Sequence, residues 1–328
     1  MSTDAIISPR LKNEFRYSFP YPVAINYKRI GGVSEANANK LMYILKTSEM
    51  IVRLLAIITL CDIRYKLKDK DIPDCALKKD FKRRFSSPSF GTWFWILRES
   101  LILLHESGSD LFIPELFDFH FTQKMKPTED IKLLNDILII RNRFIHDKVS
   151  PDEWLQPKEL PLTCEASLKK LEKVLAKLMF LADYPLIYVS PIIVEKKRYT
   201  DPQFIRDTLY ILGCADQFDK DKLKADNICE SSEVLLFSQS TNDYLNLDPF
   251  IIYSNDGMSE ITAPDGRKIM ANTNIYDVFL YNGGSEKKIE YIACNKGGNM
   301  ASKQSPKMDY LHEGYANLIS LFSMEKEK

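Results

Sequence analysis

Residues 129–147 decide the fold of the first half of the chain, and they spell EDIKLLNDILIIRNRFIHD. The apolar residues of this stretch recur at the three- and four-residue spacing of one helix face: Leu133, Leu134, Ile137, Leu138 and Ile140. Thr128 precedes the stretch as a candidate N-cap, and the acidic Glu129 and Asp130 favour a helix start. The pattern predicts an amphipathic helix that ends near Asp147.

Three other stretches in the first half show the same helical spacing. They cover residues 34–65, 93–104 and 165–183. Four amphipathic helices within 150 residues predict an antiparallel four-helix bundle over residues 35–185. Pro20 and Pro22 predict an extended N-terminal arm over residues 1–34. The basic residues 78–84, followed by a Ser- and Pro-rich stretch, predict a solvated loop.

The second half of the chain has the composition of strands and turns. Short apolar runs alternate with Gly-, Asn- and Pro-containing segments from residue 186 onward. Residues 276–280 and 289–294 are expected to pair as a hairpin around Asn282-Gly283-Gly284, and residues 310–322 to form a final helix. The expected fold class is α+β, with a helical domain over 35–185 followed by a smaller, mostly β domain over 186–328.

Bulk composition excludes several classes of protein. The 328 residues contain 45 Lys and Arg against 45 Asp and Glu, so any contact with nucleic acid requires a local basic patch. The six cysteines form no paired motif, and we expect neither a bound metal nor a cofactor. Residues 51–60 are too short an apolar run to cross a bilayer, and no signal peptide is recognisable at Met1. We therefore expect a cytoplasmic protein without membrane contact.

The end of the 129–147 stretch carries the residues best suited to chemistry. An imidazole at His146 can take a proton from a ribose 2′-OH or return one to a leaving 5′-oxygen. A guanidinium at Arg141 can stabilise the charge on a phosphorane, and Asn142 can orient either group. Five helical residues correspond to about 500° of rotation, so the two positions lie roughly 140° apart. A break near Phe144, or a second copy of the chain, is needed to bring them together.

Arg141-Asn142-x-x-x-His146 resembles the signature of HEPN domains, in which four to six residues separate an arginine from a histidine. The resemblance covers about residues 35–184. It implies a helical bundle that dimerises, a composite active site, and RNA cleavage that leaves 2′,3′-cyclic phosphate ends. It also implies roles in toxin–antitoxin pairs, CRISPR effectors and anti-phage defence. Residues 19–22 and 89–93 resemble segments of uncharacterised bacterial HEPN-containing proteins.

The first functional hypothesis is a metal-independent endoribonuclease of HEPN type that works as a homodimer in a conflict system. The β-rich half would then sense a trigger, and a partner protein is a possible regulator. The alternative is a non-catalytic module for dimerisation or RNA binding within a larger assembly. In that interpretation Arg141 and His146 only form hydrogen bonds across the interface of the dimer. A purely structural interpretation of the motif is a surface arginine and a C-terminal histidine that the helix dipole favours.

Two other groups of charged residues have both a structural and a functional interpretation. Lys82, Arg83, Arg84 and Arg143 are candidate RNA-binding residues, because basic side chains among aromatic ones can track a phosphate backbone. The structural interpretation is a solvated surface. Glu49 and the arginine four positions later predict a salt bridge, with a catalytic carboxylate at Glu49 as the alternative.

Overall fold

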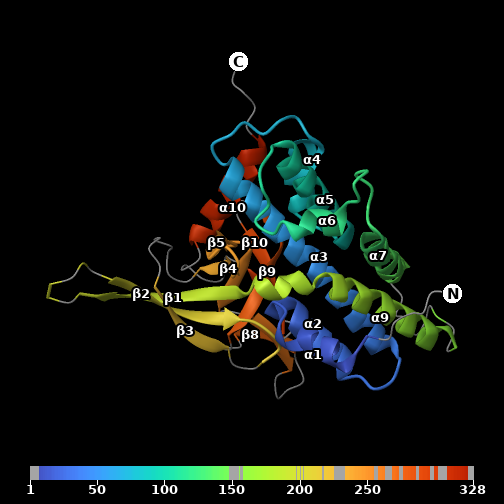
Figure 1. The fold of residues 1–328 in the computed structure, drawn as a ribbon. Coiled ribbons are helices and arrows are strands. Elements are labelled where there is room, and N and C mark those ends of the chain that lie inside the picture. The colour runs from blue at the N-terminus through green and yellow to red at the C-terminus, as the bar shows by residue number, and fades with distance from the viewer. Residues whose placement is uncertain are drawn as a thin grey trace.

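A computed structural model gives the fold of most of the chain (Figure 1). It describes residues 7–147, 155, 158–196, 198–199, 201, 203–215, 218–224, 233–254, 258–262, 268–272, 276–285, 288–295, 299–301 and 309–323. Side chains within some of these ranges, including those of residues 144–147, are outside the description. The expectation of a mixed fold, with helices first and antiparallel sheets after them, is confirmed.

The helical region is organised around one long helix, α3, which packs against α2, α5, α7 and α9. The four helices expected from the spacing of apolar residues are all present, with ends that differ by a few residues. The described helices are α1 (Pro9–Tyr17), α2 (Tyr21–Gly31), α3 (Ala38–Leu67), α4 (Ala76–Phe85), α5 (Phe90–Glu106), α6 (Glu115–His120), α7 (Glu129–Asp147), α9 (Glu159–Lys177), the 3-10 turn η1 (Met179–Asp183) and α10 (Asp309–Ser323).

The prediction of an extended arm over residues 1–34 is wrong. Two helices, α1 and α2, occupy most of this segment. Pro9 and Pro22 stand in the first turn of these helices, where a proline forfeits no intrahelical hydrogen bond. Phe15 and Phe19 are fully buried, so the segment belongs to the core.

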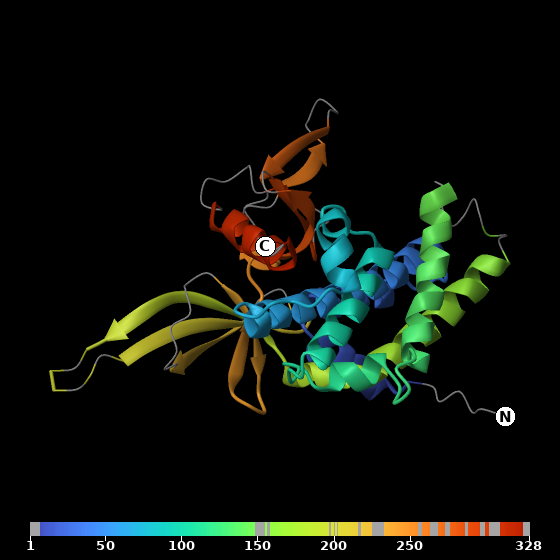
Figure 2. The same ribbon diagram turned by 90° about the horizontal axis from the view of Figure 1, so that it is seen from above.

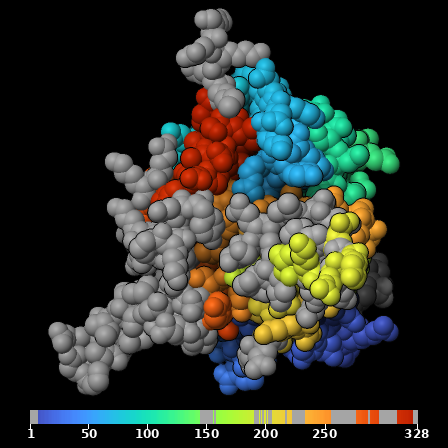
Figure 3. Space-filling model, turned by 90° about the vertical axis from the view of Figure 1, so that its left-hand side faces the viewer, coloured from blue at the N-terminus to red at the C-terminus, as the bar shows by residue number. Residues whose placement is uncertain are grey.

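The basic stretch 78–84 is also different from the expectation, because it lies within the helix α4 and not in a loop. One face of α4 buries Leu77, Phe81 and Phe85, while its basic residues point outward. Burial of these three apolar side chains stabilises the helix, although the many charged residues of the stretch suggest a solvated loop. Figure 3 shows the light-blue surface of this region beside the red α10, and the two helices pack together.

Among the described residues, the strands form two antiparallel sheets. One has the order β3-β2-β1-β4-β5 and the other the order β6-β9-β10-β11-β7-β8. Figure 2 shows the first sheet extending away from the helices, with α7 and α9 side by side at the opposite end. The strands are β1 (Leu186–Glu195), β2 (Gln203–Ile211), β3 (Asp219–Lys224), β4 (Val234–Ser238), β5 (Asp243–Asn246), β6 (Ile251–Ser254), β7 (Met258–Thr262), β8 (Lys268–Asn272), β9 (Asp277–Ser285), β10 (Lys288–Ala293) and β11 (Asn299–Ala301).

The expected hairpin is confirmed, since β9 pairs with β10, but its turn is not at Asn282-Gly283-Gly284. These residues lie inside β9, where the register shifts opposite Glu290 and Tyr291. Gly283 has φ +139°, and a Cβ there would lie 2.8 Å from the carbonyl oxygen of Ser86. The glycine is therefore required by close approach to the end of α4.

Helices and strands share one hydrophobic core. A single cluster of buried residues runs from Phe15 in α1 to Phe322 in α10. Tyr281 of β9 lies near its centre, stacks on Phe85 at 4.3 Å between ring centroids, and donates a hydrogen bond to the Phe85 carbonyl oxygen. The change from helix to strand occurs between η1 and β1, yet the packing continues across it.

None of the described helices is long and apolar enough to cross a membrane.

A buried histidine gives the fold a testable pH dependence. Burial, with a smaller contribution from Arg98, lowers the pKa of His120 from 6.5 to about 4. The unfolded chain then binds more protons than the folded one between these values, so stability is lost as pH falls from 6.5 toward 4. This one group contributes at most about 1.4 kcal/mol per pH unit. Urea unfolding of His120→Gln should show a smaller loss of stability on acidification than the wild type.

The exposed His105 provides a matched control for this experiment, as His105→Gln removes a histidine from the same region. Equal acid-induced losses in the wild type and His120→Gln would contradict the buried neutral state of His120.

Candidate functional site

The helix α7 carries the Arg141-to-His146 motif without interruption. The expected break near Phe144 is not present, because α7 continues through it to Asp147. Apolar residues hold the helix against α3 and α9 along one stripe, and this packing continues up to the motif. The 140° between positions 141 and 146 therefore remains, and the two positions belong to different stripes of the helix.

Burial distinguishes these two stripes. Position 141 continues the stripe of the buried Leu134 and Ile137. Position 146 continues the stripe of Ile139 and Arg143, which are both exposed. The side chain of His146 itself lies outside the described residues. Within one chain, the backbone does not bring the two motif positions to a common face.

On the buried stripe, Arg141 is held by a carboxylate from α3. Its Nη2 atom donates to Oε2 of Glu49 at 3.2 Å, and its guanidinium carbon lies 6.0 Å from the ring centre of Phe90. Glu49 and Arg141 side chains are only 18% and 20% exposed, so water screens this ion pair weakly. The contact joins α3 to α7 across 92 residues of sequence.

The same carboxylate also binds Arg53, which confirms the predicted salt bridge within α3. Arg53 Nη2 donates to Glu49 Oε1 at 2.9 Å, while Nη1 donates to Oδ1 of Asn282 at 2.9 Å and, at 3.4 Å, to the carbonyl oxygen of Tyr281. Its guanidinium also lies 5.4 Å from the ring centre of Trp93. Burial lowers the pKa of Arg53, and Glu49 opposes that shift. Glu49 is thus a bridge between two arginines.

These side chains line a cavity of about 410 Å³. Its polar wall carries three cationic side chains and one carboxylate, and its apolar wall is formed by methionine, leucine and isoleucine side chains. The lining residues are Met42, Leu45, Lys46, Glu49, Met50, Arg53, Arg141, Asn282 and Ile292. A cavity with uncompensated positive charge is suited to an anion that brings its own apolar or aromatic part.

Lys46 contributes the least compensated charge in this cavity. No described side chain forms a hydrogen bond or ion pair with its ammonium group. Burial lowers the pKa of Lys46, and the neighbouring Arg29 lowers it further. A half-buried cation with these neighbours destabilises the empty protein, and an anion in the cavity would relieve the repulsion.

The other predicted site residues do not line this cavity. Lys82, Arg83 and Arg84 are on α4 and line no part of this cavity; Arg83 and Arg84 bind Asp80. Asn142 is half-buried next to Arg141. The structure therefore brings together Arg141 and Glu49, and it leaves the α4 residues apart from them.

Sequence reasoning missed Lys46 and Asn282 as site residues. Lys46 lies one helical turn before Glu49 and two turns before Arg53 on the same face of α3, and this spacing could have identified it. The sequence predicts a turn at Asn282, and only the position of β9 against α3 brings its amide oxygen to Arg53.

Removal of the Glu49 carboxylate should destabilise the protein, because this carboxylate balances the charges of two arginines. Glu49→Gln keeps the shape of the side chain but leaves the buried Arg53 without its counter-ion, so the free energy of unfolding should fall by about 3 kcal/mol. Chemical denaturation measures this loss. Glu129→Gln breaks an exposed pair on α7 and should cost less than about 0.5 kcal/mol. Equal effects of the two variants would refute the bridging role of Glu49.

Lys46 allows the opposite experiment. Lys46→Met removes the unpaired charge while keeping most of the side-chain volume, so stability should rise by about 1 kcal/mol. The same variant should bind inorganic phosphate more weakly, as measured by calorimetry. The control is Lys169→Met, which changes an exposed lysine of α9. A less stable Lys46→Met protein with unaltered phosphate binding would contradict an anion site.

No grouping of three or more His, Cys, Asp or Glu side chains suited to a metal ion occurs in the part of the chain that the structure describes. No protein-family model, curated protein or solved structure matches the chain. The geometry of the cavity and of α7 is accordingly the basis on which a function is inferred.

Proposed function

We propose that this protein is a metal-independent endoribonuclease of HEPN type, in which Arg141 binds a phosphate of the RNA at the α3–α7 cavity. The observation that carries the proposal is the excess of positive charge there: Lys46, Arg53 and Arg141 face a single carboxylate. A phosphodiester backbone is an anion that such a wall can bind, and the overall neutral chain has no general attraction for RNA.

The proposed reaction needs only groups of the protein and of the RNA. His146 accepts the proton of a ribose 2′-OH, and the 2′-oxygen attacks the adjacent phosphorus. Arg141 stabilises the negative charge that accumulates on the non-bridging oxygens. The bond from phosphorus to the 5′-oxygen then breaks, and His146 returns the proton to this oxygen. The products are a 2′,3′-cyclic phosphate and a 5′-hydroxyl end.

The proposal includes a homodimer, and the placement of the two motif positions supports it. Because positions 141 and 146 lie on different stripes of a continuous α7, the site would combine Arg141 of one chain with His146 of a second copy. The exposed stripe that contains position 146 also carries Ile139, whose side chain is 45% exposed.

In this proposal the four helices α3, α5, α7 and α9 form a HEPN-like antiparallel bundle. The strand-rich half of the chain senses a signal or regulates the activity. A role in anti-phage or toxin-type conflict systems belongs to the same proposal. Five described cysteines carry free thiols, which suits a reducing compartment such as the cytoplasm.

A second function, a non-catalytic dimerisation or RNA-binding module, is favoured by one specific observation. Arg141 is already occupied by Glu49 at 3.2 Å, as expected of a structural residue. In that case the cavity binds a phosphate without cleavage of the RNA. His146 then only stabilises the C-terminal end of α7 through the helix dipole.

Substitutions in α7 separate these functions. Arg141→Ala and His146→Ala should each lower RNA cleavage by at least about a hundredfold, because each removes a group needed in the transition state. Cleavage by the wild type should persist with EDTA and leave cyclic phosphate ends, detected by end-specific ligation. Lys132→Ala, an exposed change on the same helix, should retain full activity. Unchanged RNA cleavage by His146→Ala would contradict the ribonuclease proposal.

A mixture of the two inactive variants tests the composite site. Co-expressed Arg141→Ala and His146→Ala chains form mixed dimers in which one of the two sites is intact. Random pairing should restore about a quarter of the wild-type activity. A mixture that stays inactive, although mixed dimers form, would show that the residues do not act across two chains.

A further inference from the structure

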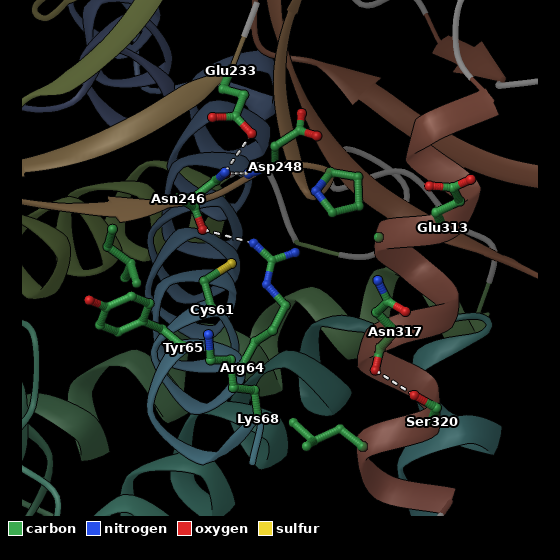
Figure 4. A pocket seen from close by; sticks show the side chains of 14 residues that line it. Cys61, Arg64, Tyr65, Lys68, Glu233, Asn246, Asp248, Glu313, Asn317 and Ser320 are labelled. Carbon is green, nitrogen blue, oxygen red and sulfur yellow. Dashed lines mark hydrogen bonds between the residues drawn. The ribbon is translucent and has the colours of Figure 1, made fainter. Parts of the chain in front are cut away.

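A second cavity, of about 560 Å³, lies between the C-terminal half of α3, the β5–β6 connection and α10 (Figure 4). Its walls come from three separate stretches of sequence, residues 61–68, 233–249 and 313–321. None of its lining residues also lines the Arg141 cavity. Its volume lies within the range of small-molecule sites.

The two cavities are separate sites on one helix. Arg53 lines the first cavity and Arg64 the second, eleven residues further along α3. At a rise of 1.5 Å per residue this amounts to about 16 Å along the helix axis. A ligand of mononucleotide size in one cavity therefore leaves the other one vacant.

One end of the second cavity is cationic. Arg64 lies in the last turn of α3, and Lys68, four positions later, is the C-cap of this helix, a spacing at which two side chains reach the same group. Arg64 Nη2 donates to the carbonyl oxygen of Asn246 at 3.1 Å, and its guanidinium lies 5.9 Å from the ring centre of Phe250. No described carboxylate forms an ion pair with Arg64 or Lys68. The guanidinium is thus held in place with donors to spare for an anion.

The opposite end is acidic. Glu233, Asp248 and Glu313 contribute carboxylates from the sheet and from α10. Figure 4 shows Glu233 and Asp248 above the Arg64 guanidinium, Glu313 to the right on α10 and Lys68 below it; Glu233 also accepts a hydrogen bond from Nδ2 of Asn246 at 2.7 Å. The cavity is therefore dipolar, and its ligand must combine an anionic group at one end with a hydrogen-bond donor at the other.

Apolar surface lies between these ends. Leu245 and Pro249 line the cavity, and Pro249 touches α10 so closely that a Cβ on Gly314 would lie 2.7 Å from its ring. At the cationic end the ring of Tyr65 is 60% exposed, and its hydroxyl is a further donor for an anion. A flat ring that links the two polar ends would pack against Pro249.

We propose that this cavity binds a nucleoside monophosphate whose base carries an amino group. The phosphate lies between Arg64 and Lys68, the base packs beside Pro249, and the amino group donates to the acidic end. Two cations match one phosphate, whereas a longer phosphate chain would meet the carboxylates. The site is independent of the ribonuclease proposed above.

Calorimetry on the full chain tests the proposal with AMP, UMP and inorganic phosphate as probes. AMP should bind, while UMP, which lacks the amino group, and phosphate, which lacks the base, should each bind at least about tenfold more weakly. Arg64→Gln and Lys68→Gln should weaken AMP binding by about tenfold or more. Lys68 is exposed, so its variant also keeps the test valid if Arg64→Gln fails to fold.

Two variants serve as controls. Lys70→Gln changes an exposed lysine just beyond α3 that does not line the cavity, and Arg141→Gln alters only the first cavity. Both should retain wild-type affinity for AMP. The proposal is overturned if AMP gives no binding at millimolar concentration, if UMP or phosphate binds equally well, or if Lys68→Gln leaves the affinity unchanged. Loss of AMP binding in Arg141→Gln alone would assign the ligand to the first cavity.

Discussion

The buried guanidinium of Arg53 is the constraint on which the arrangement of this protein depends. Only 2% of the residue is exposed, so its charge must be satisfied by the protein itself. Glu49 supplies the counter-charge, Asn282 accepts a hydrogen bond of 2.9 Å, and the Tyr281 carbonyl oxygen accepts a longer one of 3.4 Å. These partners fix α3 against β9, the two elements that carry the helical and the strand-rich halves of the chain.

The other contacts of β9 follow from this position. Tyr281 packs in the aromatic cluster at the end of α4, where its hydroxyl donates a hydrogen bond to the Phe85 carbonyl oxygen. The next residues of the strand pass so close to Ser86 that only glycine fits at position 283. The core therefore continues from helices to strands, and α3 becomes a shared wall for two cavities with different charge. One cavity is predominantly cationic and the other is dipolar.

Arg141 of the motif lines the cationic cavity. Glu49 is shared by Arg53 and Arg141, so this carboxylate balances two arginines, while Lys46 has no hydrogen-bond or ion-pair partner among the described side chains. This imbalance is the physical argument for an anion at Arg141. The continuous α7 separates the arginine and histidine positions by about 140° around one helix.

The sequence by itself determined the helices with strong apolar periodicity, the β9–β10 hairpin and the final helix, because local spacing encodes which face is buried. It also determined the Glu49–Arg53 pair, whose partners are one helical turn apart. Tertiary structure alone decided that Arg141 and Asn282 meet this pair, since their contacts span 92 and 229 residues. It also decided that residues 9–17, 21–31 and 76–85 form helices, because these segments bury aromatic side chains against the rest of the core.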